Sequence, residues 1–163
     1  MAKFIISPNL DEYNRKIYDL GAKTQPIIEK AVKEGAAPMA DAVRAAINAL
    51  PTDDSYIRKG SGKVKSGPAT AQKQAMLKGF GIAPIRNDNG FVNVKIGFDG
   101  YSNIVTKRWP QGQPVPMIAN AVEAGTSFMS ANPFMSQTVN SQRKNTENKI
   151  KEVFESEILK IIN

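Results

Sequence analysis

The sequence predicts a single α+β domain over residues 1–163, with long helices at both ends of the chain and a small antiparallel sheet between them. Apolar residues recur at helical spacing before Pro51 and again after Pro133. Between residues 92 and 98 they alternate with polar residues or glycine. Spacing of three or four residues indicates an amphipathic helix, and strict alternation indicates a half-buried strand. Together these periods favour two long helices packed on a small sheet.

The first long helix follows a possible short strand at residues 2–6. Asn9 and Glu12 have the spacing of a capping box, which marks the start of a helix. Gly21 and Pro26 interrupt the apolar pattern, so we expect a kink or a brief break near residues 21–26. The helix ends at Pro51, and its apolar stripe comprises Leu10, Tyr13, Ile17, Leu20, Ile28, Val32, Met39, Val43, Ile47 and Leu50.

A basic stretch follows the helix. Residues 51–67 are polar and contain glycine, so they predict a flexible loop. The chain has a net charge of +7, and residues 55–87 contain basic side chains but no acidic one. A solvated loop and a surface that contacts a partner or DNA both fit this composition. The candidate contact residues are Arg58, Lys59, Lys63 and Lys65.

The remaining elements follow from local signals. Residues 69–78 predict a short helix, and residues 81–86 predict a strand that pairs with 91–98 through the turn formers at 87–90. Residues 99–116 are irregular and contain Trp109, and a short helix then ends at Gly125, where we expect a positive φ. The last helix opens at Pro133 with Asn132 as a suitable N-cap. Its middle, residues 140–149, is polar on every side and faces solvent or a neighbouring subunit. Its core-facing stripe is Ile150, Val153, Phe154, Ile158, Ile161 and Ile162, and we expect Phe154 and Ile158 to share a core with Val94 and Ile96.

Composition excludes several function classes. The chain has no cysteine and no histidine, which removes thiolate metal sites, imidazole ligands and Ser-His or Cys-His catalysis. The Gly125–Ser127 turn lacks the second glycine of a nucleophile elbow, and residues 59–63 lack the P-loop pattern. Asp53 and Asp54 suit a hard cation, although two adjacent carboxylates far more often cap or solvate a loop. We therefore expect no enzyme activity, cofactor or metal. No apolar run is long enough for a signal-peptide core or a membrane span.

The order of residues in 122–134 is more specific than any of these signals. Val-Glu-x-Gly-Thr-Ser, a following alanine and then Pro-Phe at the start of a C-terminal helix resembles the signature of the tail-completion, or head–tail joining, proteins of long-tailed bacteriophages. The matching residues are Val122, Glu123, Gly125, Thr126, Ser127, Ala131, Pro133 and Phe134. The order of helix, basic loop, small sheet and terminal helix is also similar to that family.

The resemblance implies a structural virion protein of the phage neck, assembled in the host cytoplasm. It implies a homo-oligomeric ring, with a hexamer as the expected stoichiometry. The implied partners are other neck proteins (connector, head-closure or tail-terminator) and the tail tube, with non-specific contact to DNA in the channel. The alternatives are a tail terminator that caps the tail tube, a small basic nucleic-acid-binding protein and an unrecognised hydrolase. The nucleic-acid reading is weakened by few aromatics in 55–87, and the hydrolase reading by the missing histidine.

Overall fold

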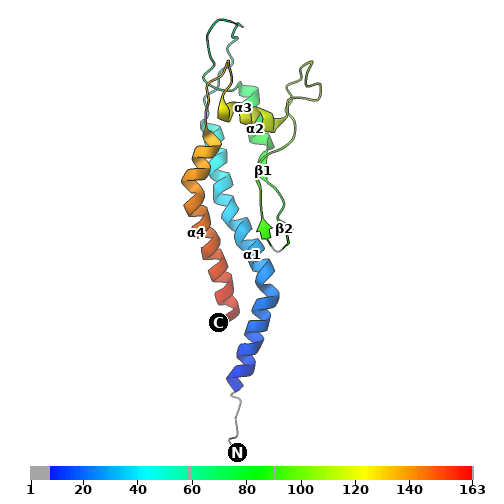
Figure 1. Ribbon diagram of the computed structural model, residues 1–163, viewed down its shortest axis with the longest axis vertical. Coiled ribbons are helices and arrows are strands. Elements are labelled where there is room, and N and C mark those ends of the chain that lie inside the picture. The colour runs from blue at the N-terminus through cyan, green and yellow to red at the C-terminus, as the bar shows by residue number, and fades with distance from the viewer. Residues whose placement is uncertain (1–7, 59, 90, 163) are drawn as a thin grey trace, which may run out of the picture.

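The computed structural model describes residues 8–58, 60–89 and 91–162, and it confirms the predicted α+β class. Two long helices run antiparallel along the molecule (Figure 1). Two short helices lie beside them at one end, and the strands run from there along the first long helix. The strand expected at residues 2–6 lies outside the described residues. In chain order the elements are α1 (Pro8–Ala49), α2 (Thr70–Gly79), β1 (Phe80–Ile82), β2 (Arg86–Asp88), β3 (Phe91–Asn93), β4 (Ile96–Phe98), α3 (Val115–Ala124) and α4 (Phe134–Ile162).

Helix α1 is continuous across the region where the sequence predicts a kink or a break. It passes through Gly21, Pro26 and Pro38 as one helix, so the break is not present. Its axis changes direction in its blue, N-terminal half (Figure 1). A proline inside a helix removes one backbone hydrogen bond and crowds the preceding turn, which bends the helix. The kink prediction therefore holds as a bend within a continuous helix.

Small residues let α1 and α4 approach closely. A Cβ atom built on Gly35 would lie only 2.2 Å from Cγ1 of Ile150, so α4 occupies the space where a side chain would be. Further along, the ammonium group of Lys30 lies 2.9 Å from the carboxylate of Glu157. These contacts set the register of the helix pair. Its buried residues include Ile27, Ala31, Ala36, Met39 and Val153.

The four strands form one long hairpin in two paired sections. β2 pairs antiparallel with β3, β1 pairs antiparallel with β4, and a bond from the Ala83 N–H to the Lys95 carbonyl lies between them. The predicted pairing of 81–86 with 91–98 is confirmed in outline. The turn is shorter than expected, because Asp88 already pairs with Phe91 and Asn89 has a φ of 55°. The single strand expected over 91–98 is divided into β3 and β4.

The main core lies where α1, α2, α3 and the β1–β4 pair meet the start of α4. Phe98 joins the elements there, since its ring centroid lies 5.2 Å from that of Phe80 and 6.1 Å from that of Phe134. Buried members from the helices include Val43, Ile47, Met76, Ile118 and Val122.

The core predicted around Phe154 and Ile158 is wrong in detail. Both side chains are half-buried, and the buried residue of that helical turn is Val153. Successive residues of a helix point about 100° apart, so burial of Val153 turns Phe154 away from the interface. Val94 and Ile96 instead line an apolar groove whose α4 wall is formed further upstream, by residues such as Val139 and Ile150.

Candidate functional site

The residues that resemble the phage signature lie together between α3 and α4, in a segment that we call the α3–α4 joint (residues 122–134). Val122 is fully buried at the end of α3. Gly125 follows with a φ of 76°, which confirms the positive φ predicted from the sequence. A Cβ atom there would lie 2.8 Å from the backbone nitrogen of Ala131. Backbone conformation and available space therefore both favour glycine at this turn.

The carboxylate of Glu123 caps the start of α4. Its Oε2 atom accepts a hydrogen bond from the Met135 N–H at 2.9 Å, and its Oε1 atom accepts one from the Ser136 N–H at 3.0 Å. A negative charge is favourable there because the first amides of a helix lack partners and carry partial positive charge. The cap expected from Asn132 is thus supplied by Glu123, from an earlier helix.

Asn132 has a different role in the joint. Its side-chain amide donates to the carbonyls of Ser66 and Ser130, both at 3.1 Å, and its backbone N–H donates to the Val122 carbonyl at 2.8 Å. Ser66 belongs to the basic loop, 66 residues earlier in the chain. The joint is therefore bonded to the end of that loop as well as to α3.

A tight loop at residues 126–129 completes the joint. The Thr126 N–H donates to the Met129 carbonyl at 2.8 Å, and the Met129 N–H donates back at 3.3 Å. The Thr126 hydroxyl accepts a hydrogen bond from the Phe128 N–H at 3.4 Å. Ser127 is exposed on the surface, as are Ala131 and Pro133. The loop turns the side chain of Met129 into the core, where it is 6% exposed.

The base of the basic loop pairs with the joint through Lys65. Its N–H donates to the Phe128 carbonyl at 2.9 Å, and its carbonyl accepts from the Ser130 N–H at 2.9 Å. The Lys65 side chain is half-buried, and its ammonium group donates to the Asp53 carbonyl at 3.2 Å. The sequence predicts Lys65 as a contact residue, but its bonds instead hold the base of the loop to the rest of the protein.

Asp53 and Asp54 close the loop and hold α2, with hydrogen-bond donors around both carboxylates. Asp53 accepts from the hydroxyl and the N–H of Ser55 and from the N–H of Ser66. Asp54 accepts from the N–H and the hydroxyl of Thr70, the first residue of α2. These bonds, led by the Ser55 hydroxyl for Asp53 and the Thr70 hydroxyl for Asp54, lower the pKa of each carboxyl below its ordinary value. The capping interpretation of this acidic pair is therefore favoured over a cation site.

The four candidate contact residues divide into different environments. Arg58 and Lys63 are exposed on the projecting part of the loop, whereas Lys65 is at its base. Lys59 lies outside the described residues. Tyr56 is 92% exposed beside them. The exposed part of the loop therefore offers a partner the cations Arg58 and Lys63 and the ring of Tyr56.

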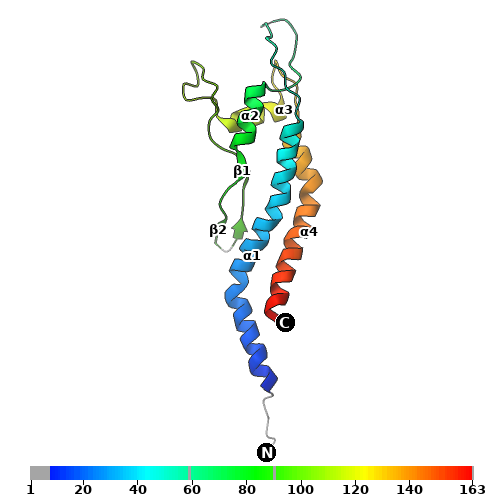
Figure 2. The same ribbon diagram turned by 180° about the vertical axis from the view of Figure 1, so that it is seen from behind.

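A second basic loop lies at the same end of the molecule (Figure 2), within residues 99–116, for which the sequence predicts only irregular structure. Thr106 and Trp109 exchange backbone hydrogen bonds of 3.1 and 3.0 Å, which turns the chain tightly. Lys107 and Arg108 are exposed in this turn, and the Arg108 guanidinium carbon lies 5.6 Å from the centroid of the Trp109 ring. Two adjacent cations before the single tryptophan were the available sequence signal.

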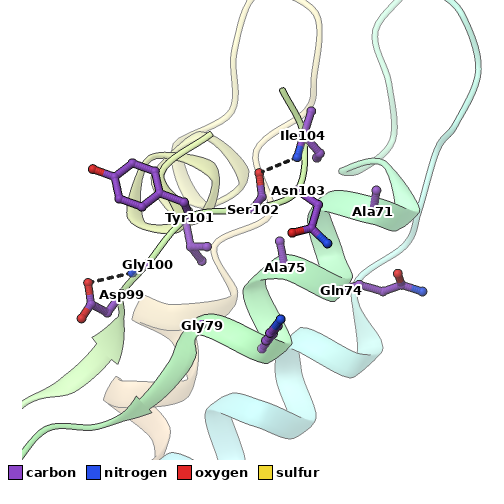
Figure 3. A pocket seen from close by; sticks show the side chains of 12 residues that line it. Ala71, Gln74, Ala75, Gly79, Asp99, Gly100, Tyr101, Ser102, Asn103 and Ile104 are labelled. Atoms are coloured by element: carbon purple, nitrogen blue, oxygen red, sulfur yellow. Dashed lines mark hydrogen bonds between the residues drawn. The ribbon is translucent and has the colours of Figure 1, made fainter. Parts of the chain in front are cut away.

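A cavity of about 400 Å³ lies between α2 and residues 99–104. Figure 3 shows the Asp99 carboxylate bonded to the Gly100 N–H at 2.7 Å and the Ser102 hydroxyl bonded to the Ile104 N–H at 3.2 Å. The polar groups of its walls thus stabilise the local chain. Within the described part of the chain, no group of three acidic side chains is arranged to hold a metal ion.

The comparisons with protein-family models, with curated proteins and with solved structures find no match for this chain. None of the helices in the described ranges is long and apolar enough to cross a membrane.

Proposed function

We propose that the chain is a structural protein of a phage neck, which forms a homo-oligomeric ring at the head–tail interface, completes the tail and allows head–tail joining. The protein acts by assembly and performs no chemistry. Its partners are other neck proteins (connector, head-closure or tail-terminator) and the tail tube, and its location is the virion. A tail terminator that caps the tail tube is the closest variant of this proposal.

The observation that carries the proposal is the order of residues in the α3–α4 joint. Its members have distinct structural tasks: Val122 fills the core, Glu123 caps α4, Gly125 makes the turn and Phe134 packs on Phe98. The residue type is therefore restricted at several positions of this segment, each for a different structural reason. The resemblance to the tail-completion signature therefore involves residues that define one structural unit.

The end of the molecule that carries the two basic loops supports a role in assembly. Arg58, Lys63, Lys107 and Arg108 are exposed there on two separate loops. Exposed cations attract an acidic surface over about 10 Å at ordinary salt concentrations. An acidic rim on a neighbouring neck protein would satisfy this charge. Lys65 and Asp53 hold one of the loops to the scaffold, so the cations are presented from a fixed base.

A second candidate function is non-specific binding of nucleic acid. The observation that favours it is the same pair of basic loops together with two aromatic side chains, Tyr56 and Trp109. Aromatic rings can stack on bases while cations contact phosphates. DNA in a neck channel and DNA bound by a free protein both present this chemistry.

Complementation with heads and tails that lack this protein tests the proposal. The informative variant carries Arg58→Ser and Lys63→Ser, and the matched control carries Arg143→Ser and Lys144→Ser, which are exposed on α4. Both variants remove two positive charges. We expect the loop variant to keep its melting temperature but to lose joining activity, most clearly at high salt, where the remaining charges are screened. The control should join heads to tails normally.

Electron microscopy and a DNA gel shift separate the candidates. Rings in negative stain, and joined particles only when the protein is added, support the neck function. Wild-type protein that forms no ring and restores no joining would refute it. Salt-dependent retardation of DNA that the loop variant loses, without any effect on joining, would favour the second candidate.

A further inference from the structure

A second groove, which we call the interloop groove, lies between the bases of the two basic loops. Its volume is about 330 Å³. The first basic loop contributes Lys65 to its wall, and the second contributes Ile104 and Gln113. The remaining wall residues come from the start of α2, from α3 and from the α3–α4 joint. Figures 1 and 2 show both loops projecting from the end of the molecule where α2 and α3 lie. The groove is therefore placed among the exposed cations of these loops.

Apolar side chains line the groove from its floor to its rim. Ile118 and Met129 are buried at the floor, whereas Met117 and Phe128 are 38% and 58% exposed at the rim. A concave apolar surface that polar residues surround is typical of a binding site. Thioether side chains are flexible and adapt to the shape of a bound group. The groove is thus suited to a large apolar side chain of a partner.

Hydrogen bonds hold the walls in place. The backbone of Phe128 is bonded on both sides, since its N–H donates to the Thr126 hydroxyl and its carbonyl accepts from the Lys65 N–H. On the opposite wall the side-chain amide of Gln72 donates to the side-chain carbonyl of Gln113 at 3.4 Å. These bonds occupy polar groups of the wall and leave apolar surface in the groove. A preformed wall also reduces the ordering cost of binding.

The surroundings of the groove are positively charged. Every wall residue belongs to one of three segments that contain no acidic side chain, namely 55–87, 100–122 and 124–146. Glu123 lies between two of these segments, and both of its carboxylate oxygens accept bonds from the first amides of α4. The exposed cations of the two loops are Arg58, Lys63, Lys107 and Arg108. An apolar interior is therefore combined with a basic rim.

We propose that the interloop groove binds an acidic segment of a partner protein that inserts one large apolar side chain. The inserted side chain contacts Met117 and Phe128, and Asp or Glu residues on either side of it pair with the loop cations. A few buried anchors contribute most of the affinity of such an interface, and the charged rim contributes specificity and speed of association. The inference rests on the proposed function and deepens it, because it gives the chemistry by which a neighbouring neck protein is recognised.

Nucleic acid matches the groove less well than an acidic protein segment does. Phosphates would contact the loop cations, as carboxylates would. The floor of the groove is aliphatic, however, and the amides of Gln72 and Gln113 bond to each other. An apolar side chain fills such a floor, whereas the polar edge of a base would lose its hydrogen bonds with water there.

Fluorescence anisotropy with three labelled peptides tests the proposal on the purified protein. The first peptide carries a Leu-Phe pair between two runs of aspartate. The second has Ser-Ser in place of that pair, and the third has lysine in place of aspartate. We expect the first peptide to bind most tightly, and to bind more weakly as salt screens its carboxylates from the loop cations. Absence of binding, or equal binding of the first two peptides, would overturn the proposal.

Variants of matched exposure locate the contact. Met117→Gln with Phe128→Ser makes the rim polar without a change in charge and should weaken binding of the first peptide about tenfold. Phe128→Ser alone, at the more exposed position, should show part of this loss with an unchanged melting temperature. Leu159→Ser is the control, because Leu159 is 54% exposed and lies near the C-terminal end of α4. Wild-type binding by both groove variants, or equal loss in the control, would overturn the proposal.

Charge variants test the rim separately. Lys107→Ser with Arg108→Ser should weaken binding of the first peptide and reduce its dependence on salt. Arg143→Ser with Lys144→Ser removes the same charge from α4 and should leave both unchanged. If the two pairs have the same effect, net charge alone attracts the peptide and the assigned rim is wrong.

Two measurements on the double groove variant, Met117→Gln with Phe128→Ser, cover other occupants. If the variant loses binding of single-stranded oligothymidylate to the same extent as binding of the first peptide, the groove serves nucleic acid and the proposal is overturned. If the variant no longer forms the ring that wild-type protein forms in negative stain, a second copy of the chain occupies the groove, which also overturns the proposal. We expect neither result.

The peptide experiments need no phage particles, so they distinguish this inference from the proposed function. Wild-type protein that joins heads to tails but does not bind the first peptide would refute the groove inference alone. Binding that depends on Met117 and Phe128, without rings or joining activity, would refute the neck function alone.

Discussion

Replacing Glu123 with alanine tests whether the α3–α4 joint depends on a cap that α3 supplies to α4. The change removes both acceptors of the bonds from the Met135 and Ser136 amides, at 2.9 and 3.0 Å. Loss of a helix cap costs about 0.5–2 kcal/mol, and hydrogen bonds to a charged group contribute about 1.5–3 kcal/mol. Glu123 is half-buried, so water replaces part of what is lost. We therefore expect unfolding to become easier by about 1–2 kcal/mol.

The assay is thermal and urea unfolding followed by circular dichroism. For a chain of this size, the expected loss lowers the melting temperature by about 2–8 °C. Glu123→Gln keeps one acceptor but no charge and should lie between the wild type and Glu123→Ala. Glu152→Ala is the control, because the Glu152 side chain is 68% exposed and its partner among the described residues is Lys149, within α4 itself. Equal unfolding free energies for Glu123→Ala and Glu152→Ala would refute the cap.

Three further predictions concern the turn, the core and the loop base. Gly125→Val should reduce soluble yield and melting temperature, because position 125 has a φ of 76° and no room for a Cβ atom; wild-type behaviour in both measurements would contradict this. Phe134→Ala should lower the free energy of unfolding by about 3–5 kcal/mol in urea, because Phe134 is buried. Phe154→Ala should lower it clearly less, because Phe154 is only half-buried. A larger loss for Phe154→Ala than for Phe134→Ala would mean that the core lies around Phe154. Asp53 and Asp54 have lowered pKa values when folded, so their stabilisation is present above about pH 4 and is lost as the pH falls through the folded values. Unfolding curves between pH 7 and pH 2 should show less acid sensitivity for the double variant Asp53→Asn, Asp54→Asn, and an unchanged profile would exclude the pair as a source of that sensitivity.

Local signals account for the elements that were predicted correctly. Pro51, Gly125 and Pro133 end or begin helices through their own backbone properties, so their effects are readable within a few residues. The hairpin follows from alternation and from turn formers in one short stretch. The positive φ of Gly125 belongs to the same group, because it reflects the end of a helix.

Long-range contacts explain what the sequence could not give. The cap of α4 comes from Glu123, which is 12 residues before Met135 in sequence, and the choice over Asn132 depends on how α3 packs. Burial of Val153 in place of Phe154 depends on the rotation of α4 against α1, which apolar spacing alone leaves open. Lys65 has the same charge as Lys63, and only its pairing with the α3–α4 joint distinguishes scaffold from surface.

The missing side chain at Gly35 also has a mechanical consequence. The side chain of Ile150 fills that space, so α1 and α4 could slide along each other only after this side chain had moved out of it. We therefore expect the helix pair to resist shear and to behave as a stiff rod. One end of the rod is tied to the basic loop through Asn132 and Ser66. A force applied to the loop would then move the whole rod and reach the opposite end of the helix pair. A flexible connection between loop and helices would instead have absorbed that force.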